Sequence, residues 1–207
     1  MARFHISLGG LVLAVLFSVS ASAQTPRTGP PDKFHGKLSA LHKKALAGDT
    51  KAQLRMGLAF EFGDGVDKDL AEAMRWYRMA ADRGDPVAQT DLGYLYETGS
   101  AGPKDPAEAA KWYTRAAVSG LARAKFNLGV LYLQGAGVEK SEEEAAHWIS
   151  EAAETGCPGA VAALGNMYAN GWGVSRDPEK ALELSRKAAR TDPDLCMSLR
   201  GGASDQR

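Results

Sequence analysis

The chain contains few of the residues that build catalytic and metal centres. Its 207 residues include only 2 cysteines and 4 histidines. None of the three histidines after the N-terminal segment (His35, His42 and His147) has a cysteine, serine or acid at the spacing of a triad or metal site. Acid–base chemistry also needs carboxylates held in a water-excluded cleft, which scattered acids do not supply. We therefore expect no catalytic residue, no cofactor and no metal, and a protein that is not an enzyme.

The sequence also lacks an excess of charge of either sign. Its 25 Lys and Arg residues balance its 25 Asp and Glu residues, so the formal net charge is zero. Binding to nucleic acid needs a clustered basic surface, and the charges here are mixed in sign along the chain. We therefore exclude nucleic acid as the expected partner.

Long apolar runs are absent after the N-terminus. The single run, Leu8 to Val19, precedes Ala21-Ser22-Ala23 and is shorter than the roughly 20 residues of a membrane span. Small residues in this arrangement are typical of a signal peptidase site, so we interpret residues 1–23 as a signal peptide and predict a periplasmic or secreted protein. A retained membrane anchor is the alternative. Residues 24–36 have the proline content of a flexible linker, and residues 201–207 are predicted to be a disordered tail.

In place of these features the sequence has a strict internal repeat. Glycines, alanines and aromatic residues return every 36 residues without an insertion or deletion, as in the series Gly57, Gly93, Gly129 and Gly165, the series Ala52, Ala88, Ala124 and Ala160, and the series Trp76, Trp112 and Trp148. A period in this range is typical of a solenoid, in which each unit buries its apolar face against its neighbours. The repeat predicts an extended surface in place of a closed pocket.

Each unit has the pattern of a helix, a turn and a second helix. In the first unit Ala52, Met56 and Ala59 share one face of the first helix, and Asp69-x-x-Glu72 is a capping signal for the second. Glycine at residue 57 and its equivalents is costly inside a helix and indicates that another helix approaches closely. We predict an all-α fold, an α/α solenoid over residues 37–200 with terminal capping helices and four repeats at about 49–84, 85–120, 121–156 and 157–191.

The repeated pattern Ala-x-x-x-Leu-Gly-x-x-Tyr-x-x-Gly-x-Gly-Val, followed by Ala-x-x-Trp-Tyr-x-x-Ala-Ala-x-x-Gly, resembles the Sel-one-like repeat, a relative of the tetratricopeptide repeat. The resemblance implies a curved partner-binding face, as in adaptor and regulatory proteins that bacteria often export. The fourth unit has Leu184-Ser185 in place of Trp-Tyr, which is typical of a terminal repeat. We predict a front helix over Leu38 to Leu46 and a short closing helix over Asp194 to Leu199.

The candidate binding surface is the side of the first helices opposite the core, where the repeats differ. A solvent-facing side has little reason to carry many apolar residues unless a partner covers it. Packing between neighbouring first helices is the alternative interpretation. An aromatic residue that occurs once, at the tip of a glycine turn, is a further candidate anchor. The predicted partner-binding residues are Leu54, Leu58, Phe62, Tyr94, Phe126, Val130, Asn166 and Trp172.

The two cysteines, Cys157 and Cys196, both lie in the part of the chain predicted to be exported. An oxidising compartment favours a disulfide between them, which would connect the fourth unit to the closing helix. Two separate thiols are the alternative.

The functional hypothesis is a monomeric, exported, non-enzymatic scaffold that binds another protein on the concave surface of its first helices. An envelope adaptor, a regulator of a membrane sensor and a toxin-neutralising immunity protein all fit this hypothesis, because relatives have these roles. The alternative from another class is a hydrolase or cell-wall-binding protein that acts on β-lactam-like or peptidoglycan substrates, since such activity has been proposed for some relatives.

Overall fold

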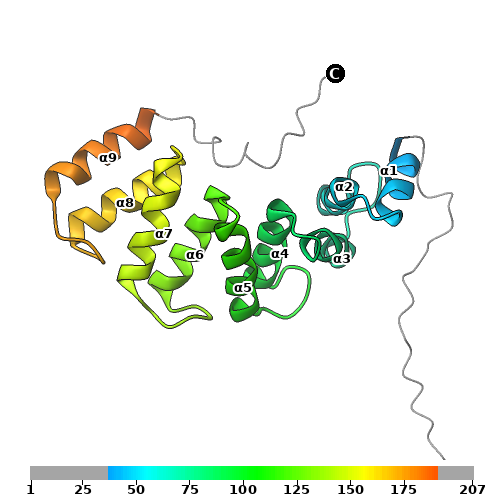
Figure 1. Ribbon diagram of the computed structural model, residues 1–207, viewed down its shortest axis with the longest axis horizontal. Helices are drawn as coiled ribbons and strands as arrows, with labels where there is room; N and C mark the ends of the chain where they lie inside the picture. Colours follow the sequence, from blue (N-terminus) through cyan, green and yellow to red (C-terminus); the bar gives the residue numbers. More distant parts are fainter. Residues whose placement is uncertain (1–36, 191–207) are drawn as a thin grey trace, which may run out of the picture.

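The computed structural model describes residues 37–190 of the chain. The predicted signal peptide, linker, closing helix and tail lie outside the described residues. Between residues 37 and 190 the chain forms nine α-helices and no strand, and the helices follow one another along a bent row (Figure 1). None of these nine helices combines the length and the apolar character that a membrane crossing requires.

The helices after the first are nearly equal in length, and they alternate between a first and a second helix of each unit. Each of α2 to α8 packs against the helix before it and the helix after it, and α9 packs against α8. The predicted all-α solenoid and its front helix are therefore confirmed. The bounds are α1 (Lys37–Leu46), α2 (Thr50–Phe62), α3 (Leu70–Ala81), α4 (Pro86–Thr98), α5 (Pro106–Val118), α6 (Ala122–Gln134), α7 (Glu142–Glu154), α8 (Pro158–Asn170) and α9 (Pro178–Arg190).

The helix ends follow from the local sequence. Asp69, Asp105 and Ser141 accept hydrogen bonds from backbone N–H groups three residues later, at 3.0, 3.0 and 3.1 Å, and so cap α3, α5 and α7. The helices α2, α4, α6 and α8 all end at a glycine whose φ lies between 65° and 77°. Other residues rarely adopt this left-handed conformation, which explains why glycine recurs there.

The glycine inside each first helix lies against the second helix of the same unit. A Cβ atom at Gly57 would stand 2.4 Å from the ring of Tyr77, and one at Gly129 would stand 2.6 Å from Ile149. The predicted close helix approach is therefore present. It lets a large side chain of the second helix reach the backbone of the first, where it is fully buried.

Successive units are also joined through the turns between helices. The backbone of Gly173 lies against the start of α7, because a Cβ atom there would be 1.9 Å from the carbonyl oxygen of Glu142. Gly137 makes the equivalent contact with Pro106 at the start of α5. These two turns therefore rest on the unit before them, and this contact restricts how one unit is oriented relative to the next.

Candidate functional site

Two of the predicted binding residues project from the first helices into solvent. The side chain of Phe62, at the end of α2, is 62% exposed, and that of Tyr94, in the middle of α4, is 47% exposed. Burying such side chains against a partner would contribute roughly 1.5–3 kcal/mol each.

Leu58 and Val130 are the repeat equivalents of Tyr94 on α2 and α6, and both are half-buried. Leu58 also packs against the core cluster of the first two units. Asn166 is the fourth equivalent, on α8, and is exposed; its carbonyl oxygen accepts a hydrogen bond of 2.8 Å from the side chain of Asn170. We call the set Leu58, Phe62, Tyr94, Val130, Asn166 and Asn170 the first-helix surface. It changes from apolar at α2 to polar at α8.

The prediction that Leu54 lies on an open surface is wrong. Leu54 is only 8% exposed and belongs to a core cluster that contains Val87 and Ala88 of α4. Phe126 is half-buried and packs against the core between α7 and α8, with its ring 3.7 Å from the position of a Cβ at Gly159. Phe126 therefore lies against the first turn of α8, and Leu54 shares a core cluster with the first turn of α4, as the packing interpretation proposed.

Trp172 lies in the turn that leaves α8 and is 44% exposed. Its backbone N–H donates to the carbonyl oxygen of Met167 at 3.1 Å, and its neighbour Gly173 rests on α7. The ring is therefore presented from a turn that two helices hold in place, at the far end of the same helix that carries Asn166.

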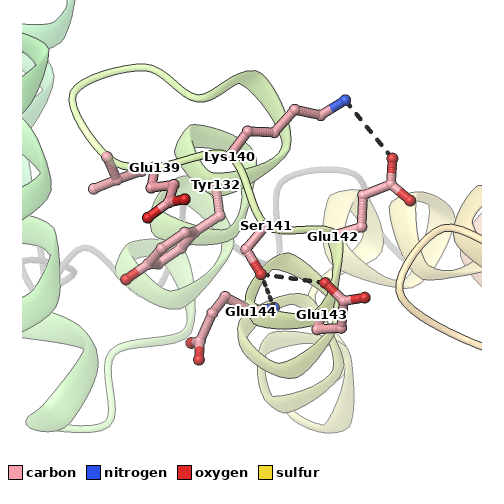
Figure 2. A pocket seen from close by; sticks show the side chains of 8 residues that line it. Tyr132, Glu139, Lys140, Ser141, Glu142, Glu143 and Glu144 are labelled. Carbon is pink, nitrogen blue, oxygen red and sulfur yellow. Dashed lines mark hydrogen bonds and ion pairs between the residues drawn. The ribbon is translucent and has the colours of Figure 1, made fainter.

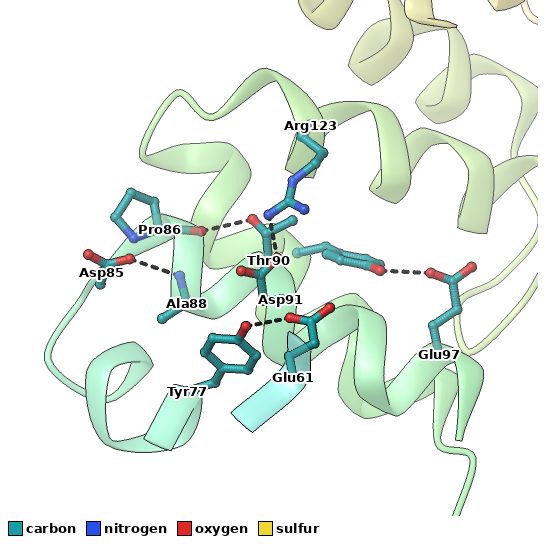
Figure 3. A network of polar contacts seen from close by, with 10 residues as sticks. Glu61, Tyr77, Asp85, Pro86, Ala88, Thr90, Asp91, Glu97 and Arg123 are labelled. Atoms are coloured by element: carbon teal, nitrogen blue, oxygen red, sulfur yellow. Dashed lines mark hydrogen bonds and ion pairs between the residues drawn. The ribbon is translucent and has the colours of Figure 1, made fainter. Parts of the chain in front are cut away.

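Pairs of tyrosine and glutamate support the first two units from inside. The hydroxyl of Tyr77 donates to Glu61 at 2.5 Å, and that of Tyr113 donates to Glu97 at 2.7 Å (Figure 3). Burial of the Tyr113 ring is the largest cause of a strongly raised pKa for its hydroxyl, which keeps it a donor. Sequence reasoning missed these pairs, although their joint replacement in the third unit, by Ile149 and Leu133, is a visible signal.

A buried ion pair joins the second and third units. Arg123, at the start of α6, lies 2.6 Å from Asp91 of α4, and their side chains are 11% and 3% exposed (Figure 3). Beside them the hydroxyl of Thr90 donates to the carbonyl oxygen of Pro86 at 2.8 Å. The pair was not predicted, because neither residue recurs at the equivalent positions of other units. It links α4, the helix that also carries Tyr94, to α6.

A shallow hollow at the α6–α7 turn gathers several carboxylates (Figure 2). Its polar contacts are those of a helix start: Ser141 caps α7, and Lys140 lies 3.7 Å from Glu142. Glu139, Glu143 and Glu144 are exposed to water. Since water surrounds these acids, the hollow does not provide the enclosed setting that acid–base catalysis requires. Within residues 37–190 no three acidic, histidine or cysteine side chains are grouped so that they could hold a metal ion.

Cys157 precedes the first residue of α8 and is 2% exposed. Cys196 lies outside the described residues. The disulfide between them therefore stays a prediction.

Comparison with protein families gives one match that recurs along the chain. A family described as the Sel1 repeat matches residues 50–85, 86–120, 122–157 and 158–190. These four segments coincide within a few residues with the helix pairs α2–α3, α4–α5, α6–α7 and α8–α9. A search of curated proteins gave no match.

Several solved structures are similar to the chain. A protective antigen present in uropathogenic Escherichia coli strains, which displays an SLR fold, is 41% identical with a TM-score of 0.72 over 74% of this chain. A Sel1 repeat protein from Oxalobacter formigenes is 35% identical with a TM-score of 0.71 over 75% of this chain. The matches cover only 33% and 64% of those two proteins. A Sel1 repeat protein from Klebsiella pneumoniae, 22% identical with a TM-score of 0.55 over 73% of each chain, shares the fold.

Proposed function

Because the chain belongs to the Sel1 repeat family, whose members generally mediate protein–protein interaction and are generally non-catalytic, we propose that it is an exported scaffold. It binds one partner protein on the first-helix surface defined above. The protein acts by recognition and carries out no chemical step.

The observation that carries this proposal is the exposure of Phe62 and Tyr94. Both side chains are aromatic and largely exposed, and they stand on the neighbouring first helices α2 and α4. Aromatic residues of this kind are the usual energetic centres of protein interfaces. Leu58 and Val130 extend the same surface with half-buried apolar side chains, and Asn166 continues it with a polar one.

The scaffold supports recognition because its surface is formed before the partner arrives. Tyr113 pressed against Gly93, the Asp91–Arg123 pair and the turn at Gly173 hold the first helices in fixed positions. A preformed surface loses little conformational freedom on binding, so more of the contact energy appears as affinity. The polar end at Asn166 and Asn170 then contributes specificity through hydrogen bonds.

Residues 1–23, interpreted as a signal peptide, determine the proposed compartment, and the compartment limits the class of partner. We place the mature protein in the periplasm or outside the cell, where an envelope adaptor, a regulator of a membrane sensor and an immunity protein are the three roles that fit. The protective antigen of uropathogenic Escherichia coli supports an envelope or external setting, although this chain spans only a third of that protein.

Affinity capture tests the proposal. The bait is the mature chain from Gln24 onward, incubated with the envelope and culture fractions of the native cells. The double variant Phe62→Asp and Tyr94→Asp is the negative bait, and Val118→Asp is the control, because Val118 is 75% exposed at the end of a second helix. We expect one protein that the parent and the Val118 variant retain and the double variant loses. Equal recovery by all three baits would reject the first-helix surface as the binding site.

A further inference from the structure

The last unit of the solenoid has an uncovered side. In α3, α5 and α7 five or six residues are buried, whereas in α9 only Ala181 is. Leu182 is 52% exposed, while its repeat equivalents Ala110 and Ala146 are 4% and 5% exposed because the next unit covers them. Ala189 is likewise exposed, whereas its equivalents are buried: Ala81, Ala117 and Ala153. The face of α9 with Leu182 and Ala189 thus corresponds to an interior surface of the other units.

We propose that residues 191–200 of the same chain cover this α9 face and that a disulfide between Cys157 and Cys196 holds them there. This inference concerns the end of the solenoid and is independent of the first-helix surface.

The position of Cys157 supports the proposal. α8 and α9 pack side by side (Figure 1), and Ala188, near the end of α9, packs against the core cluster that contains Cys157. The segment that leaves α9 at Arg190 reaches Cys196 after six residues. Six extended residues span about 20 Å, whereas packed helix axes lie about 8–10 Å apart, so the thiols can meet.

The composition of the segment complements the face it would cover. Asp192 and Asp194 follow directly on the last turn of α9, which carries Lys187 and Arg190. The negative end of the helix favours the two basic residues in its last turn. Opposite charge then attracts the two acids to these bases. Leu195, Met197 and Leu199 then supply the apolar atoms that Leu182 and Ala189 require.

The bond forms by thiol–disulfide exchange. A disulfide-bearing oxidant of the exported compartment accepts one thiolate as a mixed disulfide, and the second thiolate then displaces it. The two protein sulfurs lose two electrons and two protons in total, and the oxidant is released as a dithiol. Closing a loop of about 40 residues in this way restricts the unfolded chain and stabilises the folded one.

Hydrogen exchange on the mature full-length protein tests the proposal. We compare the oxidised parent with Cys196→Ser, which removes the bond without touching the described core, and with Leu195→Asp plus Leu199→Asp, which keeps the bond and removes apolar contact. We expect the amides of α9 to exchange at least tenfold faster in both variants, while those of α3 exchange as in the parent. Mass spectrometry should find no alkylated thiol in the oxidised parent and one in Cys196→Ser.

Three outcomes would overturn the proposal. The first is α9 exchange that is the same in the oxidised parent and both variants. The second is a parent with two alkylated thiols. The third is α9 protection that rises with protein concentration together with a dimer in sedimentation, because a second copy would then cover the face. Loss of partner capture is not expected from either variant, so this test is separate from that of the first-helix surface.

Discussion

The ring of Tyr113 lies against the backbone of Gly93, so that a Cβ atom at residue 93 would stand 2.7 Å from the ring carbon Cε1. The same contact recurs between Gly57 and Tyr77 and, with isoleucine in place of tyrosine, between Gly129 and Ile149. It explains why glycine, which is unfavourable inside a helix, occurs in the middle of the first helices. The contact sets the distance between the two helices of a unit.

The first prediction concerns this contact. Gly93→Ala should lower the free energy of unfolding by about 1–3 kcal/mol, because overpacking outweighs the gain of roughly 1 kcal/mol in helix propensity. Gly159→Ala is the control, since its Cβ would have no neighbour nearer than 3.7 Å, and it should cause no loss. Urea unfolding followed by circular dichroism measures both. A Gly93→Ala protein as stable as the parent would contradict the packing described.

The second prediction concerns the hydrogen bond from Tyr113 to Glu97. A double-mutant cycle with Tyr113→Phe and Glu97→Leu should give a coupling energy of about 1–3 kcal/mol, because a buried hydroxyl donates to a charged acceptor. The control cycle pairs Tyr113→Phe with Glu61→Leu, whose carboxylate accepts from Tyr77 instead. Its coupling should be within about 0.5 kcal/mol of zero. Equal coupling in the two cycles would show that the bond contributes nothing specific.

The third prediction concerns pH and the front helix. The ring of His42 in α1 lies edge-on to Trp76 at 5.7 Å between centroids, and burial lowers its pKa below 6.5 despite the opposing effect of Glu72. The unfolded chain therefore binds a proton at higher pH than the folded one. The contribution of His42 to stability is complete above pH 6.5 and decreases as the pH falls through that value.

The measurement is the melting temperature between pH 7.5 and 5 for the parent and for His42→Gln, which cannot titrate. As the pH decreases, the melting temperature of the parent should fall more than that of His42→Gln. A difference that is constant across this range would show that protonation of His42 does not weaken the packing of α1.

The sequence predicts most of the fold because its determinants are local. The caps at Asp69 and Ser141 and the turn glycine at Gly63 need only a few neighbouring residues to act. The exposure of the first-helix side chains depends instead on how far one first helix is displaced along the next. Leu54 shares a core cluster with Val87, and Phe126 lies beside Gly159. The repeat pattern alone does not predict either position.

The same reason explains the polar contacts that were missed. Asp91 and Arg123 are 32 residues apart and lie on different units, so their pairing follows from how the second and third units stack. For the Tyr113–Glu97 pair, the sequence offers one indication: both residues are replaced together in the third unit, by Ile149 and Leu133. This joint change can be interpreted as a lost hydrogen bond only when the position of the Tyr113 ring on Gly93 is known.

The most direct test of the central claim is site-specific photocrosslinking in the native cells. A photoreactive phenylalanine analogue replaces Phe62, Tyr94 or, as the control, Val118, each of which is exposed. We expect one crosslinked partner of the same mass from positions 62 and 94 and none from position 118. Crosslinks to that partner from position 118, with none from positions 62 and 94, would contradict it.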